Sequence, residues 1–178
     1  MAHKSQMEFV ERVKRDYPKS FRRCRVLEIG SLNLNGSVRR FFDDCQYTGI
    51  DCHEGKDVDV VTLAHEFDGG PFDTVISCEA FEHDPHLRET LAAAYRLLDT
   101  DGLFVATWAG PARPEHGTRA SNGKVWGPDG DYYRGVGADE FLTLVGSRFF
   151  PRQISVKPDK NGGEEDVYFW GIKSCLSA

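Results

Sequence analysis

The stretch VLEIGSLNLNGSVRRFF, residues Val26–Phe42, decides how this chain folds. Its apolar start predicts a buried strand ending at Gly30, where the absence of a side chain lets the backbone turn sharply. Small polar residues follow, and Asn33 or Asn35 can cap a helix that begins near Gly36. The expected helix would turn three apolar side chains inward: Val38, Phe41 and Phe42. A strand, a glycine turn and a helix in this order are typical of a nucleotide-binding unit.

An acid follows at the spacing that such a unit requires. Asp51 ends the segment QYTGID, about 20 residues after Gly30. A carboxylate at the end of the second strand can accept hydrogen bonds from both hydroxyls of a ribose. A purely structural turn with a capping aspartate is the alternative. The glycine and the acid together favour an adenosine site.

The turn lacks the second glycine that a pyrophosphate needs, because Gly36 is the next glycine after Gly30. Pyrophosphate binding requires a close, glycine-lined backbone at a helix start. The longer and bulkier loop suits a ligand without phosphate, such as S-adenosylmethionine. Glu28 lies inside the strand, where an isolated charge is costly to bury. We therefore expect Glu28 to organise the loop or to face the ligand's ammonium group.

The rest of the chain alternates strands and helices. An opening helix within residues 1–20 and a helix from Pro85, capped by Asp84, are predicted by their apolar spacing. Two alternating segments flanking an Asn-Gly turn close the chain as an antiparallel hairpin. The remaining predicted elements are strands at 46–51, 57–62, 72–78 and 102–108, a helix at 137–146, and hairpin strands at 149–158 and 166–173. The pattern predicts an α/β fold in one domain, residues 1–178: a doubly wound, Rossmann-like, seven-stranded and mostly parallel sheet with a C-terminal antiparallel hairpin.

Composition narrows the class of partner. The net charge of −6 disfavours a sequence-independent nucleic-acid binder, whose surface is normally basic. We see no signal peptide and no apolar run long enough to span a membrane, so a cytoplasmic protein is expected. The five cysteines, including Cys175, are scattered and predicted to be reduced.

Residues 109–136 are rich in Gly, Pro, Asn and Asp and lack periodicity, which predicts a functional loop over a substrate. His116, Tyr133 and Arg134 in this loop suit an acceptor pocket. The alternative is a polar loop with Tyr133 packed on the core.

Ionisable residues gather in CEAFEHDPH, where the fourth strand leaves the sheet. His83 is the first candidate for a general base because histidine titrates near neutral pH, with Glu82 and His86 beside it. The alternative is a structural histidine at a helix start. His83, His86 and His116 would bind one zinc, iron or nickel ion only if the side chains of His83 and His86 pointed to the same side of a helix. Because Asp84 and Pro85 interrupt them, no metal is predicted.

The segments VLEIGS, NGSVR, YTGID and residues 72–108, with the closing hairpin, resemble the class I S-adenosylmethionine-dependent methyltransferases. More narrowly, they are similar to the small methyltransferase type 11 group. The resemblance implies that Glu28, Gly30 and Ser31 lie near the methionine end of the cofactor, and that Asp51 binds the ribose. Asn35, in the same loop, is a further candidate for contact with the cofactor. It also implies that Cys52, Ala64 and His65 lie near the adenine, where Leu63 stands in place of the family's usual acid, and that Cys78 and Glu79 lie beside the sulfonium.

We therefore expect S-adenosylmethionine as the cofactor and methyl transfer to a small or sugar-like acceptor at oxygen or nitrogen. His83, Glu82, His86, His116 and Tyr133 are the catalytic candidates. A nicotinamide-dependent oxidoreductase, a non-catalytic S-adenosylmethionine-binding protein and a nucleic-acid methyltransferase are the alternatives. Nucleic acid is not expected as a partner, because the sequence has neither a basic track nor a motif of the kind that methylates base amines. No membrane partner is expected. A monomer or homodimer is predicted.

Overall fold

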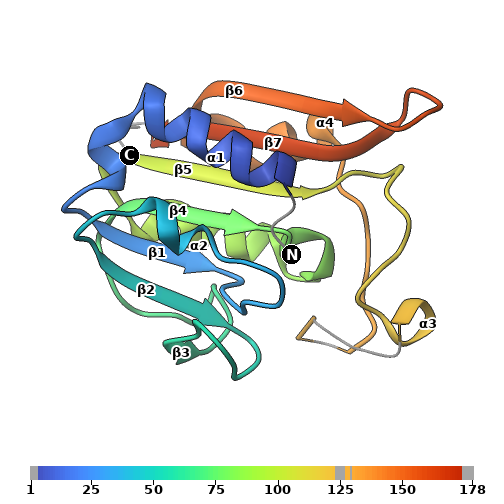
Figure 1. Ribbon diagram of the computed structural model, residues 1–178, viewed down its shortest axis with the longest axis horizontal. Helices are drawn as coiled ribbons and strands as arrows, with labels where there is room; N and C mark the ends of the chain where they lie inside the picture. Colours follow the sequence, from blue (N-terminus) through green and yellow to red (C-terminus); the bar gives the residue numbers. More distant parts are fainter. Residues whose placement is uncertain (1–3, 123–126, 129, 174–178) are drawn as a thin grey trace.

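The computed structural model describes residues 4–122, 127–128 and 130–173. Within these residues a seven-stranded sheet has the order β3-β2-β1-β4-β5-β7-β6 (Figure 1). The strands are β1 (Arg25–Ile29), β2 (Gln46–Asp51), β3 (Val60–Val61), β4 (Phe72–Cys78), β5 (Leu98–Ala109), β6 (Phe149–Pro158) and β7 (Glu164–Lys173). The helices are α1 (Lys4–Asp16), α2 (Leu87–Leu97), α3 (Arg119–Asn122) and α4 (Ala138–Val145).

The predicted topology is confirmed. β1 to β5 pair in parallel, and β7 runs antiparallel between β5 and β6. The turn from β6 to β7 is closed by Asp159, whose carboxylate accepts hydrogen bonds from the N–H groups of Asn161 and Gly163. The sheet order reverses between β1 and β4, the point at which ligands bind in open α/β sheets.

Helices cover both faces of the sheet (Figure 1). On one face α1 buries Phe9, Val10 and Val13 against the strands. On the other face α2 and α4 pack over a core that includes Trp108 and Phe141, whose rings stack 4.2 Å apart. The central strands are buried on both faces, which explains their continuous apolar sequences. None of the helices in the described residues has the length and apolar character needed to cross a bilayer.

The prediction of a helix after the glycine turn is wrong. The chain forms only a 3₁₀ turn at Val38–Phe41, and it is capped by Ser37, whose hydroxyl accepts a hydrogen bond from the N–H of Arg39. Asn33 instead accepts from the N–H of Gly36 inside the loop. The long loop uses the residues that a crossover helix would need, and α1 covers this face of the sheet in its place.

Three predicted boundaries also move. α2 begins at Leu87, because Asp84 accepts a hydrogen bond from the N–H of His86 and closes a turn before the helix. β5 starts at Leu98 and includes Asp101, which has a φ of 57° and lies near an irregularity in the β4–β5 register. The third strand shortens to Val60–Val61. Part of the predicted loop 109–136, and Cys175, lie outside the described residues.

Candidate functional site

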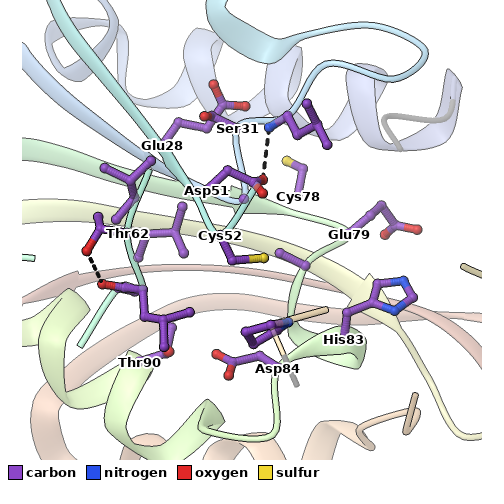
Figure 2. A pocket seen from close by; sticks show the side chains of 18 of the residues that line it. Glu28, Ser31, Asp51, Cys52, Thr62, Cys78, Glu79, His83, Asp84 and Thr90 are labelled. Atoms are coloured by element: carbon purple, nitrogen blue, oxygen red, sulfur yellow. Dashed lines mark hydrogen bonds between the residues drawn. The ribbon is translucent and has the colours of Figure 1, made fainter. Parts of the chain in front are cut away.

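A cavity opens at the carboxyl ends of β1, β2 and β4, where the sheet order reverses. The empty space within it, including the open mouth, is about 970 Å³. Figure 2 shows side chains from these strand ends and from α2 converging on it. The predicted site residues that line it are Glu28, Gly30, Ser31, Asp51, Cys52, Ala64, His65, Cys78, Glu79 and His83.

Gly30 forms the floor of the turn. Its φ is 76°, and a Cβ atom at this position would lie 2.5 Å from the Cβ of Ala80. The N–H groups of Gly30 and Ser31 both donate to the carbonyl oxygen of Ile50, at 2.9 and 3.0 Å. These bonds tie the turn to the end of β2, so the loop and Asp51 are held in register. Only glycine satisfies both the positive φ and the contact with Ala80.

The carboxylate of Asp51 is oriented by two backbone donors. Its Oδ2 atom accepts a hydrogen bond from the N–H of Leu32 at 3.0 Å, shown dashed in Figure 2, and its Oδ1 atom accepts from the N–H of His53 at 2.9 Å. Each carboxylate oxygen has a second lone pair. The group is therefore fixed in place and can still accept hydrogen bonds from a ligand in the cavity.

Glu28 is buried in β1 with an exposed fraction of 5%. The hydroxyl of Tyr47 donates a hydrogen bond to its Oε2 atom at 2.8 Å. Burial raises the pKa of Glu28 to about 8 despite this bond. Beside it, the hydroxyl of Ser31 is buried and makes no hydrogen bond within the described part of the chain. This end of the cavity thus holds two polar groups suited to a polar ligand.

Acidic groups gather on the side of the cavity next to β4. Glu79 is buried with a φ of 57°, and its Oε2 atom lies 3.8 Å from a guanidinium nitrogen of Arg113. Burial, followed by the charge of Glu82, raises the pKa of Glu79 well above its usual range. Burial acts in the same direction on Glu82, but nearby His116, whose Nε2 atom is 3.5 Å away, and the charge of His83 outweigh it and lower the pKa of Glu82. Of these two buried carboxyl groups, Glu79 thus favours the neutral form and Glu82 the ionised form.

Glu82 and His83 lie in a 3₁₀ turn at Phe81–His83, and the loop packs against them. The Nε2 atom of His116 is 3.5 Å from the Oε1 atom of Glu82. The rings of His83, His116 and Tyr133 lie within 5.0–5.5 Å of one another, centroid to centroid. The N–H of Arg134 donates to the carbonyl of Glu82 at 2.8 Å. The structure therefore brings the predicted loop residues to the predicted reaction centre.

Two predicted residues lie elsewhere. Asn35 is exposed and does not line the cavity, although its neighbours Leu34 and Gly36 do. His86 stands apart from the other catalytic candidates, with its ring 5.0 Å from that of His65. Glu82, His116 and Tyr133 lie beside His83 without lining the cavity themselves.

Sequence reasoning missed several lining residues. Thr90 was hidden in the apolar stripe of α2, although a polar residue in such a stripe is a signal. Leu32 and Leu34 follow the glycine turn, but nothing in their type points to a ligand. Thr62 and Pro128, the latter from the loop, were missed as well.

A scan against protein-family models and a search of curated proteins gave no match. Solved structures of similar fold do exist. One is the 1,6-didemethyltoxoflavin N1-methyltransferase from Burkholderia thailandensis with bound 1,6-didemethyltoxoflavin and S-adenosylhomocysteine, at 19% identity and a TM-score of 0.68, covering 94% of this chain and 78% of that chain.

Two others have comparable similarity. The N-methyltransferase NodS from Bradyrhizobium japonicum, in complex with S-adenosylhomocysteine, has 14% identity and a TM-score of 0.66 over 96% of this chain and 88% of that chain. The magnesium protoporphyrin IX methyltransferase from Synechocystis, with bound S-adenosylmethionine, has 13% identity and a TM-score of 0.66 over 97% and 80%. The chain therefore has the fold of the S-adenosylmethionine-dependent methyltransferases of known structure.

Proposed function

We propose that this protein transfers a methyl group from S-adenosylmethionine to a small-molecule acceptor. The observation that carries the proposal is the cavity at the reversal of the sheet order, with the Gly30 turn and the fixed carboxylate of Asp51 at the ends of the adjacent parallel strands β1 and β2. The likeness in fold to methyltransferases is consistent with this site.

The residues present fit this cofactor. Asp51 offers acceptor lone pairs for the hydroxyls of a ribose, and Cys52, Ala64 and His65 line the neighbouring wall, where an adenine would lie. The buried hydroxyl of Ser31, which has no hydrogen-bond partner in the described residues, suits the amino-acid end. When bound, S-adenosylmethionine supplies an electrophilic methyl group on a sulfonium.

Glu28 has a specific part in this arrangement. A cationic ammonium group beside it would favour its ionised form, so binding would release the proton that burial retains. Cys78 and Glu79 line the adjoining wall, on the side of His83. The protein's contribution is to align the two reactants and to keep water out.

The acceptor would enter on the side of His83 and Pro128, where residues of the 109–136 loop meet the cavity. Tyr133 and His116 pack against His83 there and give this side an aromatic character. This environment and the acidic net charge favour a small or sugar-like acceptor, methylated at oxygen or nitrogen, over a nucleic acid.

Calorimetric titration of the purified protein with S-adenosylhomocysteine and, separately, with NAD tests the cofactor. We expect S-adenosylhomocysteine to bind and NAD not to bind. Asp51→Ala should weaken binding about 10- to 100-fold, the equivalent of one or two hydrogen bonds to a charged group. The same change at exposed Asp68 should leave the affinity unchanged.

NAD binding without S-adenosylhomocysteine binding would overturn the proposal. A screen of candidate acceptors with S-adenosylmethionine carrying a labelled methyl group then identifies the reaction. Cofactor binding with no incorporation into any acceptor class would favour a non-catalytic binding protein, and incorporation into nucleic acid alone would contradict a small acceptor.

A further inference from the structure

The cluster of Glu82, His83 and His116, in which the first two residues are buried and His116 is partly buried, combines one carboxylate with two imidazoles. One ligand atom from each residue lies within 4.8 Å of the others. We propose that these three side chains form a binding site for a divalent first-row transition metal, such as zinc, manganese or iron(II). From the sequence, a shared ion among His83, His86 and His116 depended on the first two facing together, and no metal was predicted; in the fold, Glu82 takes the place of His86 beside the other two.

A second observation points to a cation at this place. The Glu82 side chain is fully buried, and neither of its oxygens accepts a hydrogen bond that meets normal geometry within the described residues. Its nearest cationic partner there is His116 Nε2, at 3.5 Å. Leaving the oxygens of a buried carboxylate without hydrogen bonds is costly, and a bound metal ion would give them a direct partner.

The histidines are also held as ligands usually are. Nδ1 of His116 lies 3.1 Å from the carbonyl oxygen of Pro114. A proton on Nδ1 would donate to that carbonyl, leaving the Nε2 lone pair directed toward Glu82. The backbone of Tyr132 hydrogen-bonds the ring of His83. Such outer partners fix the tautomer and orientation of metal-bound imidazoles.

The donor set determines the class of metal. Two imidazoles and one carboxylate, with further positions open, suit first-row divalent ions rather than calcium or magnesium. Metal–nitrogen and metal–oxygen bonds of about 2.0–2.2 Å would require the three ligand atoms to approach one another by about 1 Å. His116 lies in a loop, where such an adjustment is least costly. The guanidinium group of nearby Arg113 pairs with Asp166 and Glu79, not with Glu82.

The site would adjoin the proposed cofactor cavity, because His83 belongs to both. Figure 2 shows its side chain at the edge of the cavity beside Glu79. A metal there would polarise an acceptor oxygen or nitrogen, a role that rests on the proposed function, whereas metal binding itself does not. His83 would then act as a ligand and not as a free base.

To test the site, the full chain is treated with a chelator and then titrated with Co²⁺ while its visible absorption is recorded. Zn²⁺ is then added as a competitor. We expect one equivalent of Co²⁺ to give ligand-field bands and Zn²⁺ to displace it. Glu82→Gln and His116→Ala should each weaken binding by more than about 100-fold, because even outer partners of a metal site contribute about 10- to 100-fold. His86→Ala, which changes a histidine outside the cluster, is the matched control and should bind as the unmodified chain does.

Circular dichroism checks the fold of each variant, and the loop variant His116→Ala remains informative if Glu82→Gln does not fold. Absence of Co²⁺ bands, or equal weakening by His86→Ala, would overturn the metal site. Titration of the same samples with S-adenosylhomocysteine separates the two proposals. A protein that binds this ligand but does not bind Co²⁺ overturns only the metal site. A protein that binds Co²⁺ but not the ligand overturns only the cofactor assignment.

Discussion

Replacing Glu28 with glutamine should stabilise the ligand-free protein at neutral pH. Glutamine keeps the shape of the side chain and the oxygen that accepts the hydrogen bond from Tyr47. It removes a carboxyl group whose pKa is raised mainly by burial and, to a smaller extent, by the charges of Asp57 and Asp51, while Arg39 acts in the opposite direction. The substitution therefore isolates the cost of ionising a buried acid.

The magnitude follows from proton linkage. The pKa of Glu28 is about 8 in the folded protein against 4.5 for the unperturbed group. Between these values the folded state holds a proton that the unfolded state has released, so stability falls as pH rises through this window. This linkage costs about 1 kcal/mol at pH 5 and about 3 kcal/mol at pH 7. Glu28→Gln should thus raise the unfolding free energy by about 2 kcal/mol more at pH 7 than at pH 5.

Urea denaturation of both proteins at about pH 5 and about pH 7, without cofactor, measures this difference. Because each comparison is made at one pH, contributions of other titrating groups cancel. Glu89→Gln, an exposed change on α2, is the control and should show no such dependence. An effect of Glu28→Gln that is equal at the two pH values, or a larger gain at the lower pH, would refute the reasoning.

Two further predictions concern stability. Gly30→Ala should cost about 2–5 kcal/mol in denaturant unfolding, because it adds both left-handed strain and overlap with Ala80; Gly162→Ala, with positive φ but nothing within 4 Å, should cost only about 1–2 kcal/mol, and equal costs would contradict the close contact. Phe141→Ala should cost about 3–5 kcal/mol because its ring is fully buried, whereas Phe150→Ala, 58% exposed, should change the unfolding free energy little. A small effect at Phe141 would contradict the packing described.

The order of apolar segments and turn residues along the chain was sufficient to predict the sheet. Alternating apolar segments and turn residues predicted the strands and the closing hairpin, and the spacing of Gly30 and Asp51 predicted their meeting at one cavity edge. The helix from Gly36 was predicted wrongly, because capping residues and apolar spacing do not reveal that α1 already covers that face. The boundary at Leu87 moved because Asp84 closed its own turn instead of capping the helix.

The sequence by itself determined the fold class and the position of the glycine turn, since these depend on short-range periodicity and on the rule that parallel strands end at one edge. Together with the resemblance to methyltransferases, it also predicted ten of the 22 residues that line the cavity. Only the tertiary structure decided which ionisable residues meet. Glu82 and His116 lie far apart in the sequence, and the loop that carries His116 has no periodicity from which to predict a contact. Likewise, the residue type of Asn35 did not indicate that it faces solvent instead of the cavity. The opening stretch thus fixed the turn through backbone sterics at Gly30, but long-range packing decided which of its polar residues reach the site.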